Sequence, residues 1–334
     1  MNQNPTKPWT AEDVLALSRS YQGACVLAAA AELDLFLPLA GGPLTAEALA
    51  NRLHCDLRGL TVLLDALAAL QLLEKTEDGY FLATGVAATL TPDGEQSVRA
   101  MAQHQANCLH RWAQLARVVQ TGRPAERSPS ILGEAGDQAA FIGAMDNISN
   151  RVAESVIRAV VPPDFTRLLD VGGASGTWTT AFLRACPAAT AVLFDLPPVI
   201  PMADRRLAAA GLRERVRLVA GDFATDALPA GADLAWVSAI VHQNSREQNR
   251  RLFAKVFAAL APAGRIAIRD VLMDDSRTGP VPGALFAVNM LVATEGGGTF
   301  TFDELREDLE AMGFTHAAVR RREATMNSIV VAQK

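Results

Sequence analysis

Hydrophobic and polar residues follow two different patterns along the chain, and the change between them falls near residue 164. Before it, apolar residues recur at helical spacing within residues 10–33, 44–53, 57–73, 97–119 and 141–161. After it, short apolar runs alternate with helical segments, and these runs cover residues 168–171, 191–196, 216–220, 234–239 and 265–271. Such alternation predicts a parallel sheet with helices on both faces. We therefore expect a mostly helical N-terminal part followed by an α/β part.

The N-terminal part has the pattern of a winged helix. It opens on a capping box, Thr10-Ala-Glu-Asp13, and two amphipathic helices follow the first one. Glu77-Asp-Gly-Tyr-Phe-Leu then predicts a tight turn between two short strands. The first helix has an alanine-rich face with Ala24, Ala28 and Ala31, which is typical of close helix contact, including contact between subunits.

The charge of this part argues against nucleic acid. Residues 44–91 contain three Lys or Arg but six Asp or Glu, whereas binding to phosphates requires the opposite balance. We therefore interpret it as a dimerisation module that binds no nucleic acid. A ligand-responsive regulator that uses the winged helix on DNA remains a weaker alternative.

The middle of the chain connects the two parts. A helix over residues 97–119 carries Gln103, His104 and His110, and the two histidines are six residues apart and so do not share a helix face, which disfavours a metal site. Residues 121–130 are predicted to be a linker, and Pro162-Pro163 should end the helix over residues 141–161. These signals predict three regions, residues 1–95, 96–163 and 164–334.

Composition narrows the class of protein further. Of the 334 residues, 50% are hydrophobic, the formal net charge is −5, and the four cysteines lack Cys-x-x-Cys spacing. Glu32 and Asp34 end the apolar run over residues 24–31 before it could span a bilayer. We expect a cytoplasmic protein that is not bound to a membrane.

The chemistry centres on Asp170-Val-Gly-Gly-Ala-Ser-Gly176, which follows the first run of the α/β part. Its glycines allow a sharp turn that presents a helix N-terminus to a ligand. A dinucleotide-binding Gly-x-Gly-x-x-Gly counted from Gly172 would need glycine where Ala174 and Thr177 stand. The pattern therefore favours another nucleotide-type ligand, although a turn without a ligand would look similar.

Acids follow at the ends of the next two predicted strands. Asp195 lies in Phe-Asp-Leu-Pro, where an acid can hold both ribose hydroxyls, and Asp222 precedes Phe223, a pair suited to the amino group and the ring of adenine. Each acid alone could be a capping residue. Open α/β sheets bind ligands at this end of their strands, so the set together predicts a nucleoside site.

With these motifs and Ser238-Ala-Ile-Val-His242, the chain resembles the S-adenosylmethionine (SAM)-dependent small-molecule O-methyltransferases of the plant caffeate and isoflavone type and their bacterial natural-product relatives. The resemblance extends over nearly the whole chain. It implies a class I methyltransferase fold, which is Rossmann-like and ends in a β-hairpin over residues 317–332, with a winged-helix dimerisation domain at residues 1–95. It also implies SAM as cofactor, S-adenosylhomocysteine (SAH) as product, and a homodimer formed through the N-terminal domain.

The resemblance assigns roles to individual residues. It makes His242 the general base and Asp270 its partner. Cofactor binding falls to Asp170, Gly172, Gly173, Gly176, Asp195, Leu196, Asp222, Phe223 and Ser238. The acceptor pocket would be lined by Gln103, Phe141, Met145, Phe286 and Met290, although core packing would leave the same apolar pattern.

Besides Ala174, which stands where the family's glycine motif has its middle glycine, two further motifs depart from the family pattern. The family's His-Asp-Trp is His242-Gln243-Asn244 here, and Thr299 stands where the family has a second acid, unless Glu295 replaces it. From the resemblance we expect methyl transfer to a hydroxyl group, most often a phenolic one, of a small aromatic or polyketide-like molecule. C-methylation or a non-methylating reaction on the same fold stays open, and the sequence does not identify the acceptor.

Overall fold

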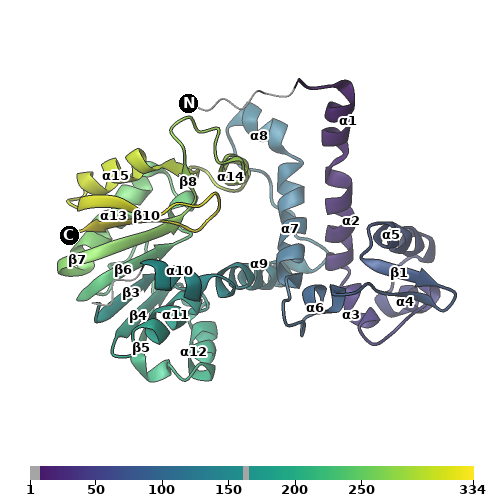
Figure 1. Ribbon diagram of the computed structural model, residues 1–334, viewed down its shortest axis with the longest axis horizontal. Coiled ribbons are helices and arrows are strands. Elements are labelled where there is room, and N and C mark those ends of the chain that lie inside the picture. The colour runs from purple at the N-terminus through teal and green to yellow at the C-terminus, as the bar shows by residue number, and fades with distance from the viewer. Residues whose placement is uncertain (1–7, 161–164) are drawn as a thin grey trace. The chain divides into compact units, whose positions relative to one another are not determined.

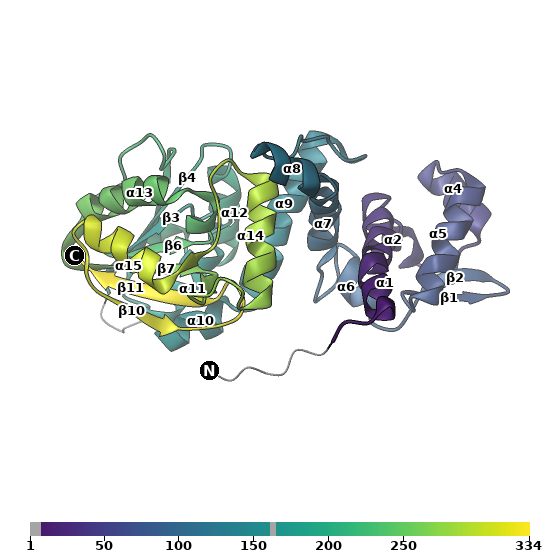
Figure 2. The same ribbon diagram turned by 90° about the horizontal axis from the view of Figure 1, so that it is seen from above.

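The structure, a computed structural model, describes residues 8–160 and 165–334. It forms two compact units (Figures 1 and 2). The first contains the chain up to His110 together with Ser128–Asn147, and the second contains Arg111–Arg127 and Ile148–Lys334.

The first unit begins with two helices in place of the single one predicted. The capping box forms as expected, because the Asp13 amide donates to Thr10 Oγ1 at 3.1 Å and the Thr10 amide donates to Asp13 Oδ2 at 3.0 Å. The helix then ends at Arg19, and a second begins at Tyr21. The helices up to the winged-helix turn are α1 (Ala11–Arg19), α2 (Tyr21–Glu32), α3 (Phe36–Leu39), α4 (Ala46–Leu53) and α5 (Leu57–Ala69).

The predicted hairpin follows α5. Strands β1 (Leu73–Thr76) and β2 (Gly79–Leu82) pair antiparallel across a two-residue turn. Asp65 on α5 ties this hairpin down, since it accepts hydrogen bonds from Lys75 Nζ and from Tyr80 Oη, both at 2.7 Å. Leucines from α4, α5 and β1 fill the core of this winged helix, as the pattern of apolar positions predicts.

The prediction of one long helix over residues 97–119 is wrong. The chain forms α7 (Arg99–Trp112) and α8 (Leu115–Thr121), after the short α6 (Val86–Leu90). The indole nitrogen of Trp112, at the break, donates to Asn289 Oδ1 at 2.9 Å, a contact 177 residues away that local periodicity cannot reveal.

The helix predicted over residues 141–161 also differs. It is divided into α9 (Gly133–Asn150) and α10 (Ala153–Val160). The early start of α9 is stabilised by Asp137, whose carboxylate accepts hydrogen bonds from the Ser130 amide, at 3.0 Å, and from the Ser130 hydroxyl. The predicted end at Pro162-Pro163 lies outside the described residues.

A seven-stranded sheet forms the centre of the second unit. Its order is β10-β11-β7-β6-β3-β4-β5, and β11 runs antiparallel to both of its neighbours. The predicted parallel strands and the C-terminal hairpin are therefore present. The strands are β3 (Arg167–Val171), β4 (Thr190–Asp195), β5 (Val216–Ala220), β6 (Ala232–Ser238), β7 (Leu260–Asp270), β10 (Thr315–Arg321) and β11 (Ser328–Gln333).

Two hydrophobic cores hold helices against the two faces of this sheet (Figure 2). Apolar residues of α10, α11 (Thr177–Ala185) and α12 (Ile200–Ala209) cover one face, and those of α13 (Arg246–Ala259) and α15 (Phe302–Ala311) cover the other. The unit also contains α14 (Val281–Ala293) and the short parallel pair β8 (Leu272–Met273) and β9 (Phe300–Thr301). Because β3 to β7 are parallel, their C-terminal ends share one edge, where the candidate residues gather.

The N-terminal helices α1 and α2 are largely exposed within one chain. Together they cover the 22 residues Ala11–Glu32, whose most apolar window has a mean hydropathy of 1.2 and is only 17% buried. By length and composition alone it could cross a membrane. The apolar run over residues 24–31, taken alone, therefore underestimates the length of apolar helix in this region.

Candidate active site

The turn after β3 has the backbone conformation that the glycine motif predicts. Gly172 and Gly176 have φ angles of +66° and +78°, and Ala174 also lies in the left-handed region at +47°. A Cβ atom at Gly172 would come within 2.7 Å of Ile240 Cδ1, and one at Gly173 within 2.6 Å of Leu193 Cγ. The turn therefore accepts no larger residues at these two positions, and it leads directly into the N-terminus of α11.

Asp195 is held at the tip of β4 by two backbone donors. The Ala174 amide donates to its Oδ2 and the Leu196 amide to its Oδ1, both at 2.7 Å. Burial nevertheless raises the pKa of Asp195 above its ordinary value. The carboxylate is thus oriented while it retains lone pairs that can accept two ligand hydroxyls.

Asp170 lies beneath the glycine turn. Its side chain is almost fully buried and accepts a 2.6 Å hydrogen bond from Thr179 Oγ1 on α11. Burial is the largest cause that raises the pKa of Asp170 to about 7, and the nearby Asp195 charge adds to it. The residue therefore links β3 to α11 from below the turn.

Asp222 and Phe223 come from the end of β5, the next strand in the sheet. The Gly221 amide donates to the Asp195 carbonyl at 2.9 Å, which ties the two strand ends together. The Phe223 ring reaches to 3.9 Å from the place that a Gly172 Cβ would occupy, and Asp222 Oδ1 accepts from the Ala224 amide at 2.8 Å. Leu196 is 47% exposed beside them. The residues predicted to bind the nucleoside thus meet at one corner of the sheet.

Ser238, at the end of β6, has a partner that the sequence analysis did not single out. Arg269 on β7 donates from Nη1 to Ser238 Oγ at 3.1 Å, and its guanidinium lies 4.5 Å from the centre of the Trp178 ring. Arg269 is almost fully buried, and this burial lowers its pKa to about 10. Nothing in the sequence pattern distinguishes it from an ordinary strand residue.

His242 and Asp270 form a buried pair. His242 Nδ1 lies 2.9 Å from both carboxylate oxygens of Asp270, and the His242 amide donates to Oδ2 at 3.3 Å. The two side chains are 8% and 3% exposed. An ionised carboxylate only accepts hydrogen bonds, so Nδ1 carries the proton and Nε2 is left as the acceptor nitrogen. This is the tautomer that a general base needs.

Only part of the predicted acceptor pocket belongs to the same unit as this pair. Phe286 on α14 meets the His242 ring edge to face, with the centroids 4.9 Å apart, and Met290 is buried one turn further on. Gln103, Phe141 and Met145 belong to the first unit. There Gln103 Nε2 donates to the Ala31 carbonyl at 3.1 Å, and Phe141 packs 5.2 Å from the His104 ring.

The two departures from the family pattern have different surroundings. Asn244 Nδ2 donates to Asn249 Oδ1 at 3.1 Å, a contact that supports the loop before α13. Thr299 is 4% exposed, and its carbonyl accepts from Arg277 Nη1 at 3.1 Å. Within residues 8–160 and 165–334, no group of three or more His, Cys, Asp or Glu is placed to hold a metal ion.

A sheet of this order that ends in a β-hairpin is the class I methyltransferase fold that the sequence predicts, and the glycine turn and the buried His242–Asp270 pair lie at the C-terminal edge of its parallel strands. Comparison with known proteins gives the family. The O-methyltransferase domain matches residues 112–315, and the O-methyltransferase dimerisation domain matches residues 16–93. The chain belongs to the O-methyltransferase family, so the predicted family, fold and enzyme class are confirmed.

Three similar proteins illustrate the range of the family. The chain is 34% identical over 311 residues, 91% of each chain, to the tetracenomycin polyketide synthesis 8-O-methyl transferase TcmO of Streptomyces glaucescens. It is 31% identical over 324 residues, 94% of each chain, to the N,N-dimethyltransferase OxyT of Streptomyces rimosus. Among solved structures, human N-acetylserotonin methyltransferase in complex with SAM matches with a TM-score of 0.82 and 25% identity over 99% of both chains.

Proposed function

We propose that this protein transfers the methyl group of SAM to a phenolic hydroxyl of a small aromatic or polyketide-like molecule, with His242 as the general base. The observation that carries the proposal is the buried His242–Asp270 pair, in which His242 Nδ1 lies 2.9 Å from each carboxylate oxygen of Asp270. The pair lies next to the strand ends whose residues are proposed to bind the nucleoside. Relatives that act on a polyketide and on N-acetylserotonin support the acceptor class.

The residues at the strand ends fit the cofactor. Gly172 and Gly173 let the turn pack tightly against Ile240 and Leu193 and lead into the N-terminus of α11, and Asp195 presents an oriented carboxylate to the ribose hydroxyls. Asp222 and Phe223 suit adenine, and Ser238, Leu196, Gly176 and Asp170 complete or support the site. When bound, SAM supplies an electrophilic methyl group on a sulfonium.

His242 would remove the acceptor's proton. A phenol has a pKa near 10 and is a poor nucleophile at neutral pH, whereas an imidazole near 6.5 is a suitable base. With Nδ1–H donated to Asp270, Nε2 takes the proton and the carboxylate stabilises the resulting imidazolium. The remaining catalysis is positioning of the acceptor oxygen against the methyl group.

In this proposal Phe286 and Met290 line the acceptor pocket within the second unit. Gln103, Phe141 and Met145, which belong to the first unit, keep the substrate-binding role that the family resemblance implies. Residues 1–95 act as the dimerisation domain, residues 96–163 as helical linker and pocket, and residues 164–334 as the SAM-binding domain. The homodimer works in the cytoplasm. In this proposal the exposed apolar surface of Ala11–Glu32 faces a second copy of the chain and no membrane.

An amine acceptor is the second candidate. The relative OxyT is an N,N-dimethyltransferase at 31% identity over nearly the whole chain. Asn244 and Thr299 stand where the O-methylating pattern has an aromatic and an acidic residue, so this chain lacks two residues of that pattern. Analysis of the methylated product by mass spectrometry and NMR separates an O-methyl from an N-methyl group.

The first experiment is calorimetric titration of the protein with SAH, with NAD as the control ligand. We expect micromolar binding of SAH alone. Asp195→Ala should weaken it about 100-fold, because two charge-assisted hydrogen bonds to the ribose are lost. The matched control is Asp204→Ala, which removes a partly exposed carboxylate on α12 that pairs with Arg213. Equal affinity for SAH in both variants would contradict the cofactor site.

Turnover is tested next with N-acetylserotonin and simple naphthols as acceptor probes. His242→Ala should lower kcat by at least about 100-fold, which is the usual contribution of a general base, while the affinity for SAH stays within twofold. A fully active variant would remove His242 from the mechanism.

A further inference from the structure

A glycine-rich loop, residues 295–298, lies directly on the backbone that carries His242. The Gly298 amide donates to the His242 carbonyl at 2.9 Å. A Cβ at Gly297 would come within 2.5 Å of the same carbonyl oxygen, and one at Gly296 within 3.1 Å of Ser245 Cβ. The position of the His242 main chain therefore depends on what holds this loop in place.

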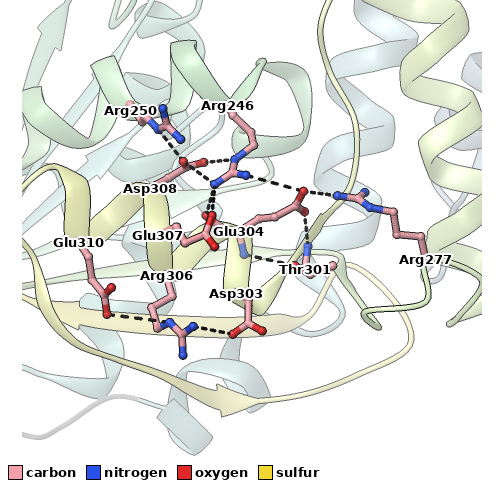
Figure 3. Close-up of polar contacts among 10 residues, drawn as sticks. All are labelled: Arg246, Arg250, Arg277, Thr301, Asp303, Glu304, Arg306, Glu307, Asp308 and Glu310. Carbon is pink, nitrogen blue, oxygen red and sulfur yellow. Dashed lines mark hydrogen bonds and ion pairs between the residues drawn. The ribbon is translucent and has the colours of Figure 1, made fainter.

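Arg277 holds the far end of the loop. It lies in the segment between β8 and α14, and its Nη1 donates to the Thr299 carbonyl at 3.1 Å. Its Nη2 pairs with Glu304, whose other oxygen accepts from the Thr301 amide at 2.9 Å and so closes the N-terminal cap of α15 (Figure 3). One guanidinium thus binds the loop and the helix that follows it.

The backbone of Arg277 is itself strained. Its φ angle is +58°, a conformation that L-residues with a side chain rarely adopt. Such a conformation costs on the order of 1 kcal/mol and persists only where the surrounding contacts enforce it. A local turn holds this conformation, because the Arg277 amide donates to the Asp274 carbonyl at 2.8 Å, and the contacts with Thr299 and Glu304 fix the side chain.

A second arginine, Arg246, connects the helix that follows the His242 loop to α15. Arg246 begins α13, immediately after the loop that carries His242. Its Nε and Nη2 donate to the two oxygens of Asp308 at 2.9 Å, and its Nη1 lies 4.0 Å from Glu304 Oε1. Figure 3 shows Glu304 between the two arginines. We name Arg246, Arg277, Glu304 and Asp308 the α15 clasp.

We propose that Arg277 is a positioning residue for His242, acting through the Thr299 carbonyl and the Gly298 amide. Arg246 is the less suitable test of this, because Asp308 is 1% exposed and loss of Arg246 would remove one of two arginines that neutralise a buried charge. The Arg277 side chain is 51% exposed, so its replacement leaves the fold intact.

The test is nitrogen NMR of the full-length protein with ¹⁵N-labelled histidine. The chain has five histidines, and the His242 ring signals are assigned by their loss in His242→Asn. In Arg277→Gln we expect the His242 ring signals to move while those of the other four histidines stay in place. Arg277→Lys keeps the charge at Glu304 but loses the fork that also reaches Thr299, so the signals should move part of the way.

Arg306→Gln is the matched control. Arg306 is also on α15, and it pairs with Asp303 at 3.0 Å and with Glu310 at 4.0 Å on the same helix (Figure 3). This variant should leave all five histidine signals unchanged. An unmoved His242 signal in Arg277→Gln overturns the proposal, and so does an equal displacement in Arg306→Gln.

The kinetic consequence rests on the proposed function. In Arg277→Gln, kcat should fall about tenfold while SAH affinity stays within twofold, because misplacement of a catalytic group by part of an ångström costs rate and not cofactor binding. An unchanged kcat contradicts the proposal. If His242→Ala proves fully active, the proposed function fails, whereas the NMR comparison still decides whether Arg277 positions His242.

Discussion

At the level of single residues, Ala174 and Asp170 each reduce the stability of the glycine turn in the proposed cofactor site. Ala174 occupies a left-handed position, where the family pattern has a glycine, yet its amide still reaches Asp195 at 2.7 Å. The alanine therefore keeps the hydrogen bond and adds backbone strain. Asp170 adds a buried carboxyl that accepts a hydrogen bond from Thr179 Oγ1. The strain at Ala174 and the burial of the Asp170 carboxyl both lower the free energy of unfolding.

Asp170 predicts a pH dependence of stability. Its pKa of about 7 in the folded state is above the ordinary 3.8, so the folded protein binds more protons than the unfolded chain between these values. The free energy of unfolding should therefore fall as the pH rises from about 4 to 7, by up to about 4 kcal/mol from this group, and change no further above that. Asp170→Asn removes this titration.

The measurement is urea unfolding of the wild type and of Asp170→Asn from pH 4 to pH 8. The stability of the variant relative to the wild type should increase across this range. Asp204→Asn, which changes a partly exposed carboxyl, is the control and should show a constant difference. A constant difference for Asp170→Asn as well would mean that the buried carboxyl is already ionised at low pH.

At the level of elements, the loop at residues 295–298 links three parts of the second unit. It connects α14, which carries Phe286 and Met290, to β9 and α15, and it packs against the loop of His242 on its way. The glycines differ in what they allow. Gly297 is closely surrounded by the His242 and Gln243 carbonyls, whereas a Cβ at Gly298 would have nothing within 4 Å.

This difference predicts that two alanine variants lose different amounts of stability. Gly297→Ala should displace the loop and lower the free energy of unfolding by about 2 kcal/mol, the usual cost of forcing an extra carbon into a packed site. Gly298→Ala should cost less than about 0.5 kcal/mol, as substitutions in open space do. Thermal unfolding of the two variants side by side measures both values. Equal melting temperatures would show that the loop does not pack on His242 in solution.

At the level of the whole molecule, the N-terminal domain leaves apolar side chains exposed on α1 and α2. Val14 and Leu17 share one face of α1, Tyr21 begins α2, and the three side chains are 54%, 61% and 57% exposed in a single chain. They lie within or next to residues 16–93, which match the O-methyltransferase dimerisation domain. A homodimer accounts for this surface, because an apolar face of this kind is buried when two copies associate.

Leu17→Glu should therefore weaken the dimer. The substitution removes about 2 kcal/mol of apolar burial from each copy and places two like charges in the interface, so the dissociation constant should rise by at least about 100-fold. Sedimentation velocity over a range of concentrations measures it. Glu77→Lys, in the exposed β1–β2 turn, is the control, and a Leu17→Glu protein that remains as dimeric as this control would exclude the face.

The sequence by itself determined the α/β sheet with its C-terminal hairpin, the winged helix, the glycine turn and the acids after it. These features depend on local spacing: apolar period, capping residues and turn chemistry are properties of neighbouring positions. The pairing of His242 with Asp270 is implied by the resemblance to the O-methyltransferase family. In the structure the two residues meet because β6, which precedes His242, and β7, which ends at Asp270, are adjacent parallel strands.

Only the tertiary structure decided the rest. It divided the helices predicted over residues 97–119 and 141–161, where contacts such as that of Trp112 with Asn289 compete with helical propensity. It also brought Arg269 to Ser238 and Arg277 to Thr299. An arginine in a loop or strand has no periodic signal, and its partner is chosen by the way the chain folds back on itself. Residues that act through such contacts therefore remain invisible until the packed molecule is known.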